Sequence, residues 1–337
     1  MLVLVIAASM FWQDISLWLY GRAQKTDAAV LEGGAELCED IVEEGIVLLK
    51  NEKDGKGNAA LPLTDQELDK GVNVFGWAGY DWMTMAFGSG YANTDLQKVK
   101  LFPALEAAGI KYNEDLYNLY KDYYTAHVKI YGEQDYLEYR GGVQFGSEEI
   151  FVLREPSYND YIAAAVKSDV IESGVGIVVI GRTGSESKDL SSSEQVRQTE
   201  AGKNIKKTFS DRHYLQLSPD EENMIKAATE LCDKVIVVLN TANTMETGFI
   251  ESEEIDGALL VGITGISGVN GLINVLRGEK EEPVPELDAD GNVKYNEDGT
   301  PVYKTDDSGK VITEKKLVSP SGRTVDTYAY DIIGTTP

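Results

Sequence analysis

One carboxylate occupies a position where α/β proteins usually place the residues that contact a ligand. The run "VVI" at 178–180 is apolar and predicts the end of a buried strand, and Glu186 follows it within the polar stretch "GSESKD" at 184–189. Loops at the carboxyl ends of strands are the usual location of ligand sites in open α/β sheets. Glu186 is therefore a candidate for chemistry that requires a carboxyl group. The ordinary alternative, a solvated loop acid in an acidic chain, stays open at this point.

The composition excludes nucleic acid as a partner. The chain of 337 residues carries 31 basic against 56 acidic residues, a formal net charge of -25, and no local cluster of Lys and Arg offsets this charge. Such a chain repels phosphate backbones and anionic membrane surfaces. Hydrophobic residues make up 42% of the sequence, which is enough for a packed core.

The cysteine and histidine content argues against a metal site or a disulfide scaffold. Cys38 and Cys232 are the two cysteines, and His127 and His213 are the two histidines. None of them has further ligands at the spacing that zinc sites need. We expect neither a metal nor an organic cofactor.

The first 25 residues are set apart from the rest of the chain. The stretch "MLVLVIAASMFW" is apolar, but it is short and lacks a basic leading segment. It fits the remnant of a signal or anchor as well as a buried strand or helix. The sequence therefore leaves the compartment open between the cytoplasm and a membrane-anchored or secreted location.

Continuous apolar runs alternate with helical patterns through most of the chain. This alternation favours a mostly parallel sheet covered by helices on both faces, a three-layer α/β sandwich. We assign one such domain to residues 26–335. Predicted strands lie at 45–51, 72–76, 174–181, 234–240 and 255–262, and predicted helices lie at 26–44, 101–110, 114–131, 219–232 and 270–278.

Several helices carry signals of packing and capping. In the predicted helix 26–44, one apolar face is formed by Val30, Leu31, Leu37, Ile41 and Val42. The tyrosines of 114–131 indicate a packing face, with a platform for sugar stacking as the alternative. Ser218 and Gly278 stand where an N-cap and a C-terminal glycine are expected. The connection 132–158 is long enough to be functional or peripheral.

Residues 279–318 predict a β-hairpin inserted into the domain. Acidic-glycine turns separate β-prone runs, and Asp-Gly between such runs is a strong hairpin signal. Asp288, Asp290 and Asn292 invite a calcium interpretation. An EF-hand loop, however, requires a bidentate Glu where this sequence has Gly299, so we favour the hairpin.

A series of motifs, in order along the chain, resembles the C-terminal α/β-sandwich domain of glycoside hydrolase family 3. The resemblance covers roughly residues 38–331, and one departure is Val325, where the family pattern usually carries proline. The matching stretches are "EEGIVLLKNE" (43–52), "LPL" (61–63), "VNVFG" (72–76), "GSG" (88–90), "KVIVVLNTANTME" (234–246) and "RGEKEE…VSPSGRTVDTYAYD" (277–331).

The resemblance implies a role for Glu186. Retaining β-glycosidases of this family take an aspartate nucleophile from a TIM barrel and a glutamate acid/base from the sandwich domain, in a loop often written "GGEGxD". The stretch "GSESKD" occupies the equivalent place, which makes Glu186 the acid/base candidate and leaves Glu194 and Glu200 as fallback acids. Arg182 and Asp189 could orient the loop or be ordinary surface charges. Gly88, Ser89 and Gly90 would form a substrate loop.

The resemblance also implies a partner. A TIM barrel takes about 250 residues, and the sandwich-like portion already occupies nearly all of this sequence. We therefore expect a barrel domain in cis or in trans, of the type in which the sandwich precedes the barrel, and a β-linked oligosaccharide or glycoside as substrate. The sequence leaves open whether the chain forms a homo-oligomer.

Two other functions compete with an acid/base-bearing domain. A non-catalytic carbohydrate- or protein-binding module is the alternative to an acid/base-bearing domain, and the tyrosine-rich stretch 117–139 is its motive. A nucleotide- or flavin-binding protein is excluded on motif grounds, because neither a GxGxxG nor a Walker loop follows a strand.

Overall fold

The computed structural model describes residues 28–53, 57–85, 99–131, 154–184, 190, 194–200, 203–297 and 299–324. The chain divides into two compact units, 1–37 and 38–337. Of the first unit, the structure describes only Ala28–Leu37, which belong to helix α3 (Ala28–Gly45).

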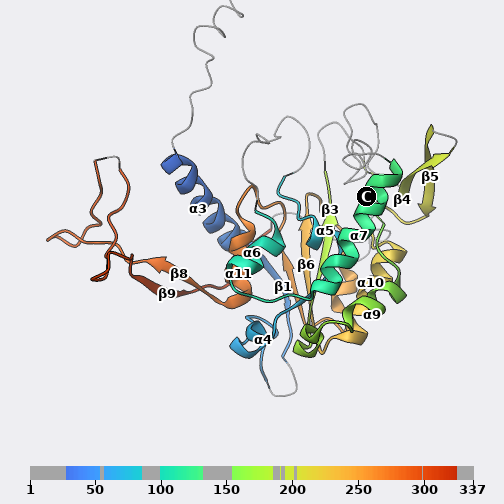
Figure 1. Cartoon of the computed structure of the whole chain (residues 1–337), viewed down its shortest axis with the longest axis horizontal. Helices are drawn as coiled ribbons and strands as arrows, with labels where there is room; N and C mark the ends of the chain where they lie inside the picture. Colours follow the sequence, from blue (N-terminus) through green and yellow to red (C-terminus); the bar gives the residue numbers. More distant parts are fainter. Residues whose placement is uncertain are drawn as a thin grey trace, which may run out of the picture. The chain divides into compact units, whose positions relative to one another are not determined.

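A five-stranded sheet forms the centre of the second unit, and its strand order is β1-β7-β6-β3-β2 (Figure 1). Four neighbouring strands run parallel, and β1 at one edge pairs antiparallel with β7. This confirms the predicted mostly parallel sheet. The strands are β1 (Val47–Asn51), β2 (Asn73–Phe75), β3 (Val175–Arg182), β6 (Lys234–Thr241) and β7 (Gly257–Leu260).

The two central strands are apolar along most of their length because both of their faces are covered. All residues of β3 are buried, and in β6 only the first residue is not. Alternation along β3 sends Arg182 towards helix α10 (Pro219–Leu231) and Gly181 towards helix α5 (Trp77–Tyr80), since the two residues contact groups of those helices. Helices therefore cover both faces, as the α/β sandwich requires.

The covering helices pack in two groups (Figure 1). Helix α10 contacts β3, β6 and helix α9 (Tyr158–Ala165), and α9 contacts α7 (Glu114–Tyr131). On the other face, α6 (Leu101–Ala107) contacts α5 and α11 (Val269–Arg277). Helix α7 also contacts α5 and strand β2, so it joins the two groups. The remaining short helices are α4 (Asp65–Lys70), η1 (Asp169–Ser173) and η2 (Gly248–Glu251).

Local sequence signals explain several helix ends. The Ser218 side chain accepts a hydrogen bond from the Glu221 amide, and the Glu221 carboxylate accepts one from the Ser218 amide, which forms a capping box at the start of α10. Helix α11 ends at Gly278 in the left-handed conformation, with φ 71°. Both ends were predicted. Within the tyrosine stripe of α7, Tyr120 and Tyr124 are buried and form a packing face, whereas Tyr117 is only partly buried.

Helix α3 differs from the sequence-based expectation. Its extent agrees with the prediction, but the proposed apolar face is wrong for two of its members. Leu37 and Ile41 are 59% and 62% exposed, and Val42 is buried against the core. The helical period suggested one face for these side chains, but it could not show that Val42 is buried while Leu37 and Ile41 are exposed.

Two antiparallel hairpins stand apart from the central sheet. Strands β4 (Glu194–Glu200) and β5 (Lys203–Ser210) form one that the sequence did not suggest. Strands β8 (Glu279–Pro283) and β9 (Thr313–Leu317) form the base of the predicted insertion. Between β8 and β9 the chain makes further antiparallel bridges, at 285–303, 287–293, 295–301 and 305–311.

The acidic turns of the insertion have a structural explanation. Oδ1 of Asp288 accepts hydrogen bonds from the backbone amides of Asp290 and Asn292, both at 2.9 Å. The Asp306 carboxylate makes the same contacts with Ser308 and Lys310. These aspartates form side-chain-stabilised turns, which accounts for the pattern that suggested calcium. Within the described ranges, no helix has both the length and the apolar character needed to cross a membrane.

Candidate functional site

The candidate site lies at the carboxyl edge of the parallel strands. Strand β2 leads into α5 and the segment 81–85, and strand β3 leads into Thr183 and Gly184. The predicted residues Gly88, Ser89, Gly90, Glu186 and Asp189 lie outside the described residues. The structure describes the residues that flank them in the sequence, at 81–85, 99–100 and 181–184.

Arg182 ends β3 in a fully satisfied, buried ion pair. Its Nη1 and Nη2 atoms donate to Oε1 and Oε2 of Glu221 at 2.6 and 2.7 Å, and both side chains are 3% exposed. The other guanidinium protons go to the backbone carbonyls of Gly181, Tyr214 and Gln216, each at 2.7 Å. Arg182 is therefore not a surface charge, and it joins the end of β3 to α10 and to the segment 214–216.

Two further side chains hold the backbone next to Gly184. The Thr183 amide donates to the Tyr214 hydroxyl at 2.9 Å, and the Asn243 side-chain amide donates to the Thr183 carbonyl at 2.7 Å. A Cβ at Gly184 would lie 3.2 Å from the Cβ of Ala242. Burial raises the pKa of Tyr214 to about 12, so its hydroxyl stays protonated at neutral pH. The backbone of Thr183 and Gly184, immediately before residues 185–189, is therefore held in place.

Asn240, on the neighbouring strand β6, fixes the start of the other segment. Its Oδ1 accepts from the Met83 amide at 2.8 Å, and its Nδ2 donates to the carbonyls of Met83 and Gly262 at 3.1 and 2.7 Å. Asn240 is fully buried. One side chain thus satisfies both backbone groups of Met83, shortly before the predicted "GSG" segment.

Val99 and Lys100, which follow that segment in the sequence, are also held in place, and Lys100 contacts residues that precede the segment. The Val99 amide donates to the Ile266 carbonyl at 2.7 Å. The Lys100 ammonium group contacts the Asp81 carboxylate at 2.6 Å and the Trp82 carbonyl at 2.9 Å. Trp82 in turn donates its indole N–H to Thr264 at 2.9 Å. The described residues on either side of 86–98 are therefore held by groups at or beyond the carboxyl ends of β6 and β7.

Glu155 is a buried acid next to the start of α5, and the sequence analysis did not identify it. Glu155 accepts from the Trp77 amide at 3.0 Å and from the Tyr161 hydroxyl at 2.8 Å. The Tyr120 hydroxyl lies 3.3 Å from the same carboxyl group. Burial, assisted by the charge of Glu221, raises the pKa of Glu155 to about 8, although these hydrogen bonds favour the ionised form.

The fallback acids occupy a different setting from the one expected. Glu194 and Glu200 were placed in a polar continuation of the Glu186 loop, but both belong to strand β4. Glu194 pairs with Ser210 and Glu200 pairs with Lys203 across the β4–β5 hairpin. Within the described residues, no three His, Cys, Asp or Glu side chains come together in a way that could hold a metal ion.

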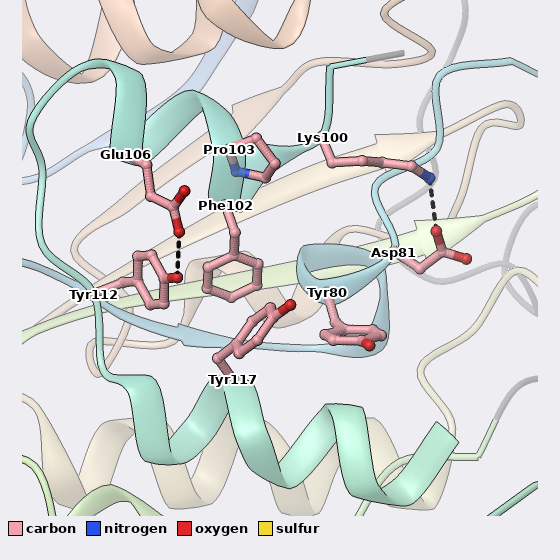
Figure 2. A pocket seen from close by; sticks show the side chains of 8 residues that line it. All are labelled: Tyr80, Asp81, Lys100, Phe102, Pro103, Glu106, Tyr112 and Tyr117. Atoms are coloured by element: carbon pink, nitrogen blue, oxygen red, sulfur yellow. Dashed lines mark hydrogen bonds and ion pairs between the residues drawn. The ribbon is translucent and has the colours of Figure 1, made fainter. Parts of the chain in front are cut away.

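A cavity of about 460 Å³ opens between α5, α6 and α7, and the sequence analysis did not identify it. Aromatic rings and two polar pairs form its wall (Figure 2). Its described lining residues are Tyr80, Asp81, Lys100, Phe102, Pro103, Glu106, Tyr112 and Tyr117. Of these, Tyr117 also belongs to the tyrosine-rich stretch 117–139 that suggested a carbohydrate-binding module.

Comparison with known proteins identifies relatives of this chain. Residues 46–293 match the family model of the glycosyl hydrolase family 3 C-terminal domain. A β-glucosidase of Ruminococcus albus is 29% identical over 244 residues, which cover 72% of this chain and 21% of that protein. The chain thus spans about a fifth of the length of this curated relative.

Solved structures of β-glucosidases share the fold. The enzyme from Paenibacillus barengoltzii superposes with a TM-score of 0.54 at 26% identity, covering 77% of this chain and 24% of that one. β-Glucosidase 3B from Thermotoga neapolitana, solved in complex with glucose, gives a TM-score of 0.53 at 22% identity, covering 76% and 31%. In both cases the likeness concerns one part of a longer enzyme.

Proposed function

The chain belongs to the family of the glycosyl hydrolase family 3 C-terminal domain, and from this premise we propose that it carries the general acid/base of a retaining β-glycosidase. Glu186 is the residue that we assign to this role. The substrate class is a β-linked oligosaccharide or glycoside, with a terminal glucoside favoured because the related Thermotoga enzyme was solved with glucose.

The observation that carries the assignment is the anchoring of the chain just before Glu186. Arg182, the last residue of β3, is held by its buried ion pair. Hydrogen bonds hold both the backbone amide and the backbone carbonyl of Thr183. The chain thus leaves the carboxyl edge of a buried parallel strand at Gly184, two residues before Glu186. A catalytic group needs such a rigid support, because small displacements of the reacting groups are costly in rate.

The chemistry requires two carboxyl groups with different protonation states. In the first step, Glu186 would protonate the glycosidic oxygen while a carboxylate about 5–5.5 Å away attacks the anomeric carbon. In the second step, Glu186 would take a proton from the water that hydrolyses the glycosyl-enzyme. Glu186 must therefore hold its proton near neutral pH until the first step, which burial beneath a bound sugar or a neighbouring anion can achieve.

The nucleophile would come from a TIM barrel in cis or in trans, in the order in which the sandwich precedes the barrel. The framework supports a shared cleft, because Asn240 and Lys100 fix both ends of the segment that holds Gly88, Ser89 and Gly90. Arg182 would act as a positioning residue through the backbone of Thr183. Asp189 would assist the same loop.

The structure removes part of the support for the second candidate, a non-catalytic binding module. It rested on the tyrosine-rich stretch 117–139, and Tyr120 and Tyr124 of that stretch are buried in the core. The effect of replacing Glu186 on turnover distinguishes the two candidates. A module without catalysis would leave the turnover of a barrel-bearing enzyme unchanged when Glu186 is replaced.

Hydrolysis of an aryl β-glucoside by the purified 337-residue chain, with Glu186→Gln as the control, is the first test. We expect no turnover by either protein, because the nucleophile is proposed to lie in the barrel. Turnover that disappears in Glu186→Gln would place a second carboxylate within this chain and contradict the barrel proposal. Turnover that persists in Glu186→Gln would contradict the role of Glu186.

A further inference from the structure

The cavity between α5, α6 and α7 combines aromatic surface with hydrogen-bonding groups. The ring centroids of Phe102 and Tyr117 are 4.8 Å apart, those of Phe102 and Tyr112 are 4.7 Å apart, and those of Tyr80 and Tyr117 are 5.3 Å apart. The rings thus form one continuous aromatic wall. Phe102 is buried behind it, whereas the three tyrosines are only partly buried and present surface to the cavity.

Polar groups stand at both ends of this wall (Figure 2). The Tyr112 hydroxyl donates to Glu106 at 2.6 Å at one end, and Lys100 pairs with Asp81 at 2.6 Å at the other. Between them, the Tyr117 hydroxyl points into the space between Phe102 and Tyr80. That hydroxyl makes no hydrogen bond to any residue in the described part of the chain, so a ligand can serve as its partner.

The charges of the wall select the class of ligand. Two carboxylates, Asp81 and Glu106, disfavour an anion, and the Lys100 ammonium group disfavours a cation. The aromatic surface favours a ligand with an apolar face, and the polar ends favour hydroxyl groups, which both donate and accept hydrogen bonds. A neutral pyranose sugar has such a face and such an edge. A volume of about 460 Å³ falls within the range of small-molecule sites.

We infer that this cavity is a sugar-binding site, in which a pyranose ring packs on Tyr80 and Tyr117 and its hydroxyls bond Glu106, Asp81 and the Tyr117 hydroxyl. This goes beyond the proposed function, since none of the described lining residues belongs to the residues assigned to catalysis. A site of this kind would hold part of an oligosaccharide, or a product, on the chain itself.

The test measures binding of methyl β-glucoside and of cellobiose to the full chain by calorimetry and by saturation-transfer NMR. We expect a Kd on the order of 1 mM, and at least a tenfold weakening in Tyr117→Phe and in Glu106→Gln. Tyr117→Phe keeps the ring and its packing, and Glu106 is exposed, so both variants should fold. Tyr295→Phe, on an exposed hairpin tyrosine, is the matched control and should bind like the wild type.

Other outcomes would overturn the inference. Absence of binding at high sugar concentration, or equal binding by Tyr117→Phe and Glu106→Gln, would show that the cavity takes no sugar. Choline that binds more tightly than the sugars and is lost in Glu106→Gln would assign the cavity to cations instead. Glu186→Gln is expected to bind sugar like the wild type, which separates a failure here from a failure of the catalytic proposal.

Discussion

Arg182 and Glu221 form a bidentate ion pair, with both side chains 3% exposed, at the point where the central strand β3 meets the first turn of α10. Glu221 also closes the capping box of α10 with Ser218. One carboxylate therefore neutralises Arg182 and caps a helix, and its charge adds to the burial that raises the pKa of Glu155. The support of the proposed catalytic loop and the stability of the core are thus coupled at one residue pair.

Loss of the Arg182 side chain should destabilise the fold strongly. Arg182→Ala leaves the Glu221 charge buried without its partner, which costs about 3–5 kcal/mol in typical proteins. Urea-induced unfolding, followed by circular dichroism, measures the change in the free energy of unfolding. Glu221→Gln, which keeps the shape of the side chain but leaves the Arg182 charge buried without its partner, serves as a second variant.

The chain offers a matched control for this prediction. Arg212 makes the same bidentate contact with Glu222, but these side chains are 37% and 48% exposed. Because exposed pairs contribute little, Arg212→Ala should cost about 0–1 kcal/mol. Equal losses in Arg182→Ala and Arg212→Ala would refute the importance of burial.

Glu155 should make the stability of the fold depend on pH. Its folded pKa is about 8 and its ordinary value is 4.5, so between these values the folded state binds more protons than the unfolded state. The free energy of unfolding therefore decreases as pH rises through this window, by up to about 1.4 kcal/mol for each pH unit. Below the ordinary value the contribution is fully present.

The measurement compares wild type with Glu155→Gln in urea at pH 5, 6, 7 and 8. Gln preserves the acceptor for the Trp77 amide and cannot ionise. The wild type should lose stability relative to the variant as pH increases. Parallel pH profiles for the two proteins would contradict the buried, protonated state of Glu155.

Asn240 should contribute to stability through the backbone that it holds. Asn240→Ala leaves the buried amide and carbonyl of Met83 and the carbonyl of Gly262 without this partner. Unsatisfied buried groups cost about 1–3 kcal/mol. Asn296→Ala, on the exposed hairpin, should change the free energy of unfolding by no more than about 0.5 kcal/mol. A similar effect of both substitutions in urea titrations would refute the anchoring role.

The insertion between β8 and β9 should be dispensable for folding. Pro283 and Thr313 face each other in the ladder, so an Asn-Gly turn can replace residues 284–312. This keeps Lys280, which pairs with Asp40 and Glu43. The Tm should change by no more than about 2 °C, the shift expected from less than about 1 kcal/mol in a chain of this size. A larger fall in Tm would show that the insertion stabilises the sandwich.

Local signals in the sequence predicted much of the fold. The cap at Ser218 and the glycine at Gly278 act through neighbouring residues, so their effects are visible in a short window. The buried strands β3 and β6 are apolar on both faces, which only a covered parallel sheet requires. The family motifs also have a structural basis, since Gly322 of "PSGR" donates to the Ile46 carbonyl and has no room for a Cβ beside Gly45.

The rest depends on contacts between distant parts of the chain. The burial of Glu155 is created by Trp77, Tyr120 and Tyr161, and nothing beside it in the sequence indicates this. Strand β4 reads as a polar stretch because it contains a single aliphatic residue, Val196. The cavity likewise joins three helices whose aromatic residues, taken separately, indicate only packing.

The most direct test of the central claim uses an enzyme in which this chain is combined with the proposed barrel, with an activated aryl β-glucoside as substrate. Glu186→Gln can still form a glycosyl-enzyme, because an activated leaving group needs little protonation, but it lacks the base for water. Azide needs no base. Glu186→Gln should therefore lose turnover with water and recover it with azide as β-glucosyl azide, while Glu194→Gln retains ordinary hydrolysis. Full hydrolysis by Glu186→Gln without azide would contradict the assignment.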